Sequence, residues 1–383
     1  MSTVLDRLAP LLPGIAARAD EIEQARQLPA DLATQLVDTG VFKLCVPREL
    51  AGGEAPPPVL LEAIEAAARA DGSVGWNIMI GATSGTTAAW LAPDAARSIH
   101  GASHAVTGGI FAPRGKAVRE GEGWRVSGTW QWASGNAQAQ WMKAGCIAWE
   151  DGKPRMLRDG VPEVLTVYLP RDRLRFADNW HVSGLCGTGS CDMSVEDVLV
   201  PADHALSLVR DRPRIDTPLY RFPVFGLLAT GCAAVALGIA RGAIDDLVAL
   251  AGAKVPTLAR RPLAERTGTQ SEIARAEAGV RGARAFLMEA IDAAWSDAEQ
   301  ARPIDPEKRM ALRLAATHAT EASARAVDAC YTLAGGSSVY RTSPLQRRFR
   351  DIHVITQHMM VAPPSYEVAG RVVLGLPTDP SML

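Results

Sequence analysis

One nearly uncharged apolar run constrains the fold of this chain more than any other segment. It extends from Phe225 to Ala240 and reads FGLLATGCAAVALGIA. This run falls short of the roughly 18 residues that would favour a membrane span. Its glycines and alanines instead favour a helix that packs closely inside a bundle. Because Arg241, Asp245 and Asp246 follow within two turns, we expect the helix to continue towards water.

The spacing of apolar residues divides the 383-residue chain into three segments. Helical spacing marks the first hundred residues, alternating β-branched and aromatic residues mark the middle, and helical spacing returns near residue 215. We expect an N-terminal helical domain over 1–103, a β-barrel domain over 104–212 and a four-helix bundle over 213–383. The predicted fold is therefore mainly α with a central β-barrel. The bundle helices are predicted at 222–251, 270–299, 306–334 and 344–375.

Composition and charge exclude several classes of protein. The net charge of −2 offers no basic surface for nucleic acid. The start, MSTVLDRLAP, lacks the features of a signal peptide, and none of the six cysteines forms a Cys-x-x-Cys pair. We therefore expect a cytoplasmic protein with reduced thiols and no membrane association. The histidines and carboxylates show no metal-binding spacing, and no Rossmann pattern indicates direct NAD(P)H binding.

Four motifs combine glycine with aromatic or basic residues. Three lie in the strand-rich middle, and the fourth follows the pair Gly335 and Gly336 near the end of the chain. The motifs are VTGGIFAPRGKA at 106–117, WQWASG at 130–135, WHVSGLCGTGS at 180–190 and RRFRDIHVITQHM at 347–359. Together they resemble the acyl-CoA dehydrogenase superfamily over nearly the whole chain. Within it they are most similar to the two-component flavin-dependent monooxygenases (group D).

The resemblance implies a reaction and its participants. Reduced flavin, either FMNH2 or FADH2, comes from a separate NAD(P)H:flavin reductase, and dioxygen is the co-substrate. A C4a-hydroperoxyflavin then oxygenates an aromatic or similar small organic substrate. The resemblance also implies a homo-oligomer, and we expect a tetramer, with a dimer as the alternative.

The resemblance also assigns flavin contacts to residues of the motifs. Trp132 lies against the isoalloxazine ring, and Ser134 offers its hydroxyl and amide near flavin N5. Other residues bring backbone amides, glycine flexibility or a guanidinium to the pyrimidine, phosphate or ribose. These further contacts are assigned to Gly135, Ala112, Pro113, Gly115, Gly335, Gly336 and Arg347. Each segment also has a structural reading, as an ordinary strand, a Gly-Pro turn or a helix surface with ion pairs.

The catalytic carboxylate of a dehydrogenase is missing from its usual position. In many acyl-CoA dehydrogenases a Glu lies eight residues after the Asp of an Arg-Asp pair. Counting from Asp351 gives Met359, whose thioether cannot take a proton from carbon. No Asp or Glu occurs from Thr217 to Ile244, where some dehydrogenases place the base instead, and Glu367 reads as an exposed helix residue. The sequence therefore favours a monooxygenase. An acyl-CoA dehydrogenase-like FAD oxidoreductase and a non-catalytic homologue remain the alternatives.

The predicted catalytic residues are His358 and Ser134. An imidazole exchanges protons near neutral pH, so His358 could deprotonate a phenolic nucleophile or hydrogen-bond the peroxide. Ser134 would hold the N5 side of the flavin. A lone histidine on a helix is also common as a structural residue. His353, His100 and His104 are further candidates.

Overall fold

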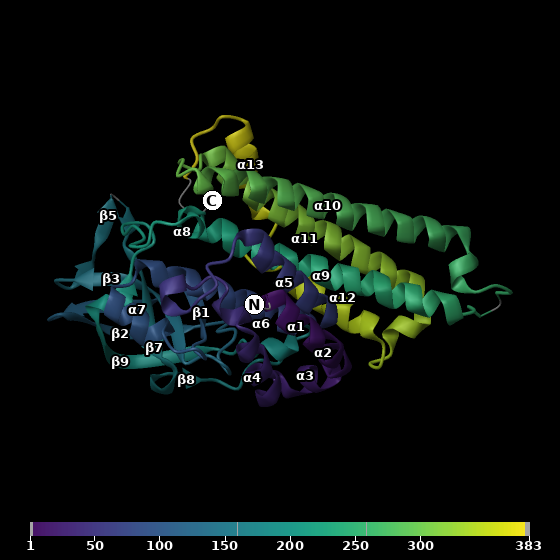
Figure 1. Cartoon of the computed structure of the whole chain (residues 1–383), viewed down its shortest axis with the longest axis horizontal. Helices are drawn as coiled ribbons and strands as arrows, with labels where there is room; N and C mark the ends of the chain where they lie inside the picture. Colours follow the sequence, from purple (N-terminus) through teal and green to yellow (C-terminus); the bar gives the residue numbers. More distant parts are fainter. Residues whose placement is uncertain (1–2, 159, 258, 380–383) are drawn as a thin grey trace.

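The computed structural model describes residues 3–158, 160–257 and 259–379. Helices form one side of the molecule, a sheet forms one end, and long helices run away from the sheet (Figure 1). The N-terminal helices are α1 (Val4–Leu8), α2 (Leu12–Ala17), α3 (Ala19–Ala25), α4 (Ala30–Thr39), α5 (Pro57–Ala70), α6 (Gly72–Ser84) and α7 (Pro93–His100).

Helix α6 connects the three parts of the molecule because it packs against α5, the first strand and the central bundle helix. It begins where the side chain of Asp71 accepts a hydrogen bond of 3.0 Å from the amide of Val74. Ala68 of α5 lies between two glycines, Gly75 of α6 and Gly238 of the bundle. A Cβ at Gly75 would lie 2.5 Å from Ala68 Cβ, and one at Gly238 would lie 2.7 Å from it. The glycines therefore allow three helix backbones to meet at one point.

The strands form one mixed sheet and a small hairpin. They are β1 (Thr107–Glu120), β2 (Gly123–Trp130), β3 (Trp141–Glu150), β4 (Lys153–Pro154), β5 (Met156–Arg158), β6 (Val161–Pro162), β7 (Val164–Pro170), β8 (Arg175–Phe176), β9 (Met193–Pro201) and β10 (Ala205–Leu206). The sheet order is β10-β7-β3-β1-β2-β9-β8, with β4 on β3, and β5 pairs with β6. Strands β1 and β3 run parallel, and the other pairs are antiparallel.

The sheet corrects one sequence prediction, because the expected β-barrel is not closed in the described part of the chain. A barrel closes when its first and last strands share hydrogen bonds. Here the end strands β8 and β10 are two residues long each, and each pairs only with an inner neighbour. The middle of the chain is therefore an open mixed sheet.

The C-terminal helices are α8 (Pro218–Arg221), α9 (Val224–Ala253), α10 (Thr267–Glu299), α11 (Pro306–Ala334), α12 (Pro344–Ile355) and α13 (Pro364–Val373). Helix α9 is central, with α5, α6, α10, α11 and α12 around it. By length and composition α9 could cross a membrane, but 78% of its most apolar window is buried inside the molecule. Packing in the bundle therefore accounts for its apolar sequence.

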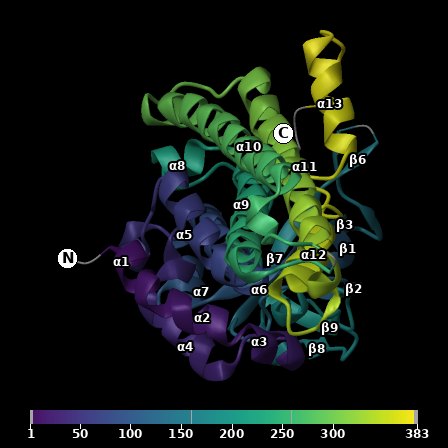
Figure 2. The same cartoon turned by 90° about the vertical axis from the view of Figure 1, so that its right-hand side faces the viewer.

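The fourth predicted bundle helix, 344–375, is two helices rather than one. Helix α12 ends at Ile355 and α13 begins at Pro364, with turns between them. Pro363 and Pro364 lack the amide hydrogens that a continuous helix needs. Helix α13 therefore takes a new direction and extends to one side (Figure 2), while it still packs against α11. His358 lies in this break and not on a helix, contrary to the sequence prediction.

Candidate active site

Trp76 of α6 brings together two segments that the sequence marks as catalytic. Its indole Nε1 donates a hydrogen bond of 3.1 Å to the hydroxyl of Ser134, which follows β2. Its ring meets the imidazole of His358 edge-on, with 5.3 Å between the ring centroids. Trp76 and Ser134 are buried, and His358 is half-buried. Three distant parts of the chain thus meet at one indole ring.

Hydrogen bonds between hydroxyls fix the direction of every proton around Ser134. Thr188 donates its only hydroxyl hydrogen to the carbonyl of Leu185 at 2.8 Å, so it accepts from Ser190 at 2.7 Å. Ser190 therefore accepts from Ser134, whose hydroxyl lies 2.6 Å away. The Trp76–Ser134–Ser190–Thr188 relay, as we call it, runs in one direction from the indole to a backbone carbonyl.

Both donors of Ser134 are used inside the protein in this structure. Its hydroxyl hydrogen goes to Ser190, and its amide donates to the carbonyl of Trp132 at 2.8 Å. The predicted hydrogen bond from Ser134 to a flavin would therefore require the hydroxyl to leave Ser190. The relay also leaves the Ser134 oxygen one free lone pair beyond its bond from Trp76.

His358 is neutral and presents one defined tautomer. Its Nδ1 accepts the amide hydrogen of Met360 at 3.3 Å, and the Cys232 sulfur lies 3.6 Å from the same nitrogen. A backbone amide can only donate, so the ring hydrogen is on Nε2. Burial, together with the nearby Arg313 cation, lowers the pKa of His358 to about 4. His358 is therefore a hydrogen-bond donor at Nε2, and this geometry favours the peroxide-binding role over the basic role.

Trp132 offers an open aromatic face beside the relay. Its side chain is 64% exposed, and its backbone has a φ of 65°, which non-glycine residues seldom adopt. The following Gly135 also has a positive φ, of 73°. The surrounding turn therefore holds a large apolar ring outward, as the ring system of a flavin requires.

The segment predicted to face the flavin pyrimidine leaves the sheet ladder. The register of β1 on β3 shifts between Ile110 and Pro113 and again between Pro113 and Gly115, so Ala112 lies outside the paired positions. Strand β2 pairs with β1 only from Lys116 onward. Pro113 and Gly115 stay paired with β3 while Ala112 does not, and none of the three has a β2 partner; their backbone contacts with a flavin stay a prediction.

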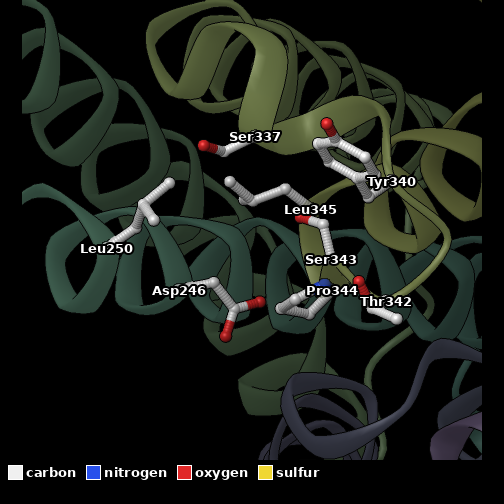
Figure 3. Close-up of a pocket in the computed structure, with 8 residues that line it drawn as sticks. All are labelled: Asp246, Leu250, Ser337, Tyr340, Thr342, Ser343, Pro344 and Leu345. Carbon is white, nitrogen blue, oxygen red and sulfur yellow. The ribbon is translucent and has the colours of Figure 1, made fainter. Parts of the chain in front are cut away.

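Gly335 and Gly336, which were predicted to contact the flavin phosphate or ribose, lie at the end of the bundle that is away from Ser134. Gly335, with a φ of 55°, ends α11, and Gly336 follows it; both are exposed. A surface pocket of about 260 Å³ lies beside them, shown in Figure 3. Its lining residues are Asp246, Leu250, Ser337, Tyr340, Thr342, Ser343, Pro344 and Leu345. The structure therefore does not bring these glycines together with Ser134 within one chain.

Arg347 is engaged by carboxylates of the N-terminal helices. Its guanidinium pairs with Glu23 at 2.8 Å and with Asp20 of α3. Its side chain is 13% exposed. The arginine predicted to bind a flavin phosphate thus ties α12 to α3, and a phosphate would have to compete with two carboxylates.

The other candidate histidines lie outside the Trp76 cluster. His353 pairs with Asp328 at 2.9 Å on the bundle surface, and His104 is exposed in a turn. His100 is buried against Tyr168. Among the residues that the structure describes, no carboxylate is hydrogen-bonded to Trp76, Ser134 or His358, and no group of three His, Cys, Asp or Glu could hold a metal ion.

Known proteins resemble this chain over its full length. Residues 230–363 match the family described as acyl-CoA dehydrogenase, C-terminal domain. The crystal structure of 3-HSA hydroxylase from Rhodococcus sp. RHA1 superimposes with a TM-score of 0.91 at 28% identity, covering 100% of this chain and 99% of that one. The oxygenase subunit HsaA of a flavin-dependent monooxygenase from Rhodococcus jostii (strain RHA1) is 29% identical over 99% of this chain and 100% of the relative. Indole-3-acetate monooxygenase of Pseudomonas putida is 33% identical over 97% of this chain and 94% of the relative.

The chain belongs to the flavin-dependent monooxygenases of the acyl-CoA dehydrogenase fold. It is an oxidoreductase that uses reduced flavin and dioxygen, as the sequence predicted. The described residues of this monooxygenase fit a flavin in their chemistry: they include an exposed aromatic ring at Trp132 and a hydroxyl relay that Trp76 links to a neutral histidine.

Sequence reasoning missed Trp76, Ser190 and Thr188 as parts of the site of this monooxygenase. Trp76 lies in a run of small residues, GSVGWNIMIG, whose composition allowed either tight helix packing or close approach of a ligand and singled out no residue. Ser190 and Thr188 lie in the GTGS motif, which marked the fold. The one sequence signal for Trp76 was a large indole ring among small residues. The fold was needed to show that this ring contacts Ser134 and His358.

Proposed function

We propose that this monooxygenase is the oxygenase component of a two-component system that oxygenates an aromatic substrate. A separate NAD(P)H:flavin reductase would supply the reduced flavin. Relatives are named for indole-3-acetate and for resorcinol, both aromatic, and one is named as an oxygenase subunit. The observation that carries the proposal is the Trp76 cluster, where a relay and a neutral histidine meet without a carboxylate.

The absence of a base near this cluster argues against the dehydrogenase alternative. Met359 stands at the usual Glu position, and its side chain is 61% exposed. Glu367 is exposed on α13. In the described residues, no Asp or Glu side chain is hydrogen-bonded to the imidazole of His358. Abstraction of a proton from carbon therefore has no carboxylate to perform it.

A bound reduced flavin would supply the electrons that activate dioxygen. The residues of the chain would position and shield that chemistry. Trp132 would cover one face of the flavin ring, and Ser134 would turn from Ser190 to hold the polar edge near N5. His358 would donate its Nε2 hydrogen to oxygen and, being neutral, would add no charge to the dry cavity. Cofactor contacts of Gly135, Gly335, Gly336 and Arg347 stay predictions.

We also propose a cytoplasmic homotetramer with domain boundaries near residues 103 and 212. All strands lie between Thr107 and Leu206, which supports these boundaries. The cysteines are free thiols, as expected in a reducing compartment. Several apolar side chains of the last helices are more than three-fifths exposed and could be buried against another copy. They are Val339, Tyr340, Met359, Val373 and Leu374.

Rapid mixing tests the proposed function. The protein is mixed anaerobically with reduced FMN or reduced FAD, oxygenated buffer is added, and the flavin spectrum is followed. A long-lived species distinct from both reduced and oxidised flavin is expected, and the more effective flavin is identified at once. Reoxidation at the rate of free flavin would contradict the proposal and return attention to tightly bound FAD and acyl-CoA substrates.

A further inference from the structure

Lys143 is a buried cation without an anion. It lies on β3, is 1% exposed, and its ammonium lies 4.1 Å from the centroid of the Phe111 ring. Among the residues that the structure describes, no carboxylate or carbonyl oxygen accepts a hydrogen bond from it. Buried charges are normally paired, because an isolated one loses its hydration without compensation.

A second buried lysine shows how this protein satisfies such a group when the role is structural. Lys43 is 5% exposed, and its ammonium donates to three backbone carbonyls. The acceptors are Leu50 at 2.8 Å, His100 at 3.1 Å and Ala102 at 3.0 Å. Lys143 has no such set, so its ammonium keeps hydrogen-bond donors that the described part of the protein does not use.

The polar side chains beside Lys143 are neutral and already satisfied. Thr87 donates to the carbonyl of Ser84 at 3.0 Å, so the hydroxyl of Tyr168 donates to Thr87 at 2.5 Å. The Tyr168 oxygen then faces His100 Nε2 at 3.3 Å. Burial and the two lysines lower the pKa of His100 to about 3, so His100 is neutral. No negative charge compensates Lys143 from these neighbours.

Aromatic rings border the lysine on the side of the flavin segment. Phe111 belongs to the stretch of β1 that leaves the ladder, and its ring meets Phe225 of α9 edge-on at 6.0 Å. Both phenylalanines are only half-buried. An aromatic substrate could contact these rings while an acidic group on it reaches the ammonium.

We propose that Lys143 binds a carboxylate of the aromatic substrate and selects for acidic substrates. This inference rests on the proposed oxygenation of an aromatic compound and names its substrate class. Lys143 is a positioning and specificity residue: its charge-assisted hydrogen bond would orient the substrate ring against Phe111 and Phe225. Burial lowers the pKa of Lys143 to about 7, so an incoming carboxylate would draw a proton onto the amine.

Binding of two matched probes tests the proposal. Calorimetry measures the Kd of indole-3-acetate and of 3-methylindole, which lacks the carboxylate, with wild type, Lys143→Met and Lys116→Met. Lys116 is the control because its ammonium also lies over a ring, at 3.9 Å from Trp149, but on the surface. Lys143→Met is expected to weaken indole-3-acetate binding about tenfold or more and to leave 3-methylindole binding nearly unchanged. Lys116→Met should change neither.

Three results would overturn the role of Lys143. Lys143→Met could change the Kd of both probes equally, or it could leave the Kd of indole-3-acetate unchanged. The third result is a wild-type protein that binds indole-3-acetate no more tightly than 3-methylindole. Weaker binding of reduced flavin by Lys143→Met without substrate would assign the lysine to the flavin instead. Wild-type protein alone gives a second test, since affinity for indole-3-acetate should fall from about pH 6 to about pH 9 while affinity for 3-methylindole stays constant. Flavin reoxidation in the same preparations reports separately on the monooxygenase proposal.

Discussion

Trp76 and Ser134 are 58 positions apart in the chain, and the indole N–H of the first donates to the hydroxyl of the second at 3.1 Å. This bond occupies one lone pair of Ser134 and helps to orient its hydrogen towards Ser190. Trp76 also meets His358. One side chain therefore sets the position of both predicted catalytic groups.

Replacing Trp76 by Phe should affect flavin chemistry more than stability. The ring contact with His358 is kept in part, and the lost hydrogen bond costs about 1 kcal/mol of unfolding free energy. We expect faster reoxidation of bound reduced flavin, because Ser134 is less well held, measured by rapid mixing. Trp90→Phe is the control: Trp90 is buried and its indole donates to the carbonyl of Asp211 at 3.3 Å. Equal reoxidation rates in both variants would argue against a role for Trp76.

The direction of the relay predicts different effects for its two serines. Ser134→Ala removes the group that would turn to the flavin, so flavin affinity should fall about tenfold. Ser190→Ala removes the acceptor of the Ser134 hydrogen, which frees that hydrogen for the flavin, and it also removes the donor to Thr188. Titration of each variant with reduced flavin should therefore show a loss for the first and no loss for the second. Similar losses in both would mean that the relay serves packing alone.

Because the pKa of His358 is lowered to about 4, its ionisation should not change the oxygenation rate near neutral pH. The neutral form predominates above that value, so the substrate oxygenation rate should show no histidine ionisation between about pH 5.5 and 8. Below this range, protonation of the buried ring would reduce activity. Stability falls as pH drops from the ordinary histidine pKa of 6.5 to about 4, because the unfolded state binds the proton first. A rate profile with a midpoint near the ordinary histidine pKa would contradict the neutral assignment.

Two substitutions, His358→Gln and His358→Asn, test whether His358 acts through a hydrogen on Nε2. Gln places its amide near the Nε2 position, while Asn places it near Nδ1, which already accepts from Met360. His358→Gln should therefore retain more coupling between flavin oxidation and product formation than His358→Asn. The measurement is the ratio of product to oxidised flavin. The reverse order would place the functional nitrogen at Nδ1.

Asp351 gives a stability test away from the flavin. Its carboxylate accepts the amide of Leu185 at 2.6 Å, and burial together with nearby Asp71 raises its pKa to about 7. The folded state then holds a proton that the unfolded state has lost, so stability falls as pH rises from the ordinary Asp pKa through 7. Asp351→Asn keeps an acceptor for Leu185 and should raise Tm at pH 8 by about 2–4 °C, with a smaller gain at pH 5, by scanning calorimetry. Asp328→Asn, at the surface pair with His353, is the control.

Periodicity predicted the long helices well because an apolar stripe must face the bundle core along many turns. The start of α9 was predicted at residue 222 and lies at Val224, and α11 was predicted at 306–334 as observed. The break after Ile355 was missed, since the apolar spacing continues through it and the tandem prolines were read as part of a helix. Closure of the sheet could not be read from strands because it depends on pairing between its end strands.

The candidate site was only partly predictable from the sequence, because some of its residues are defined by their partners in space. Motifs indicated Trp132, Ser134 and His358, whose residue types carry recognisable chemistry. Trp76 and Lys143 lie in stretches without a motif, and their meaning comes from partners that are present or missing in space. Arg347 shows the converse: its motif suggested phosphate, but its neighbours are carboxylates.

The thiol of Cys232 lies 3.6 Å from His358 Nδ1, in an enzyme that uses dioxygen and therefore handles oxidants derived from it. Burial raises the pKa of this thiol to about 12, so almost none of it is the thiolate that such oxidants attack. The packing that keeps His358 neutral thus also keeps its sulfur neighbour chemically inert. A buried, protonated thiol is a poor nucleophile, so Cys232 is a slow target for any peroxide that leaves the flavin.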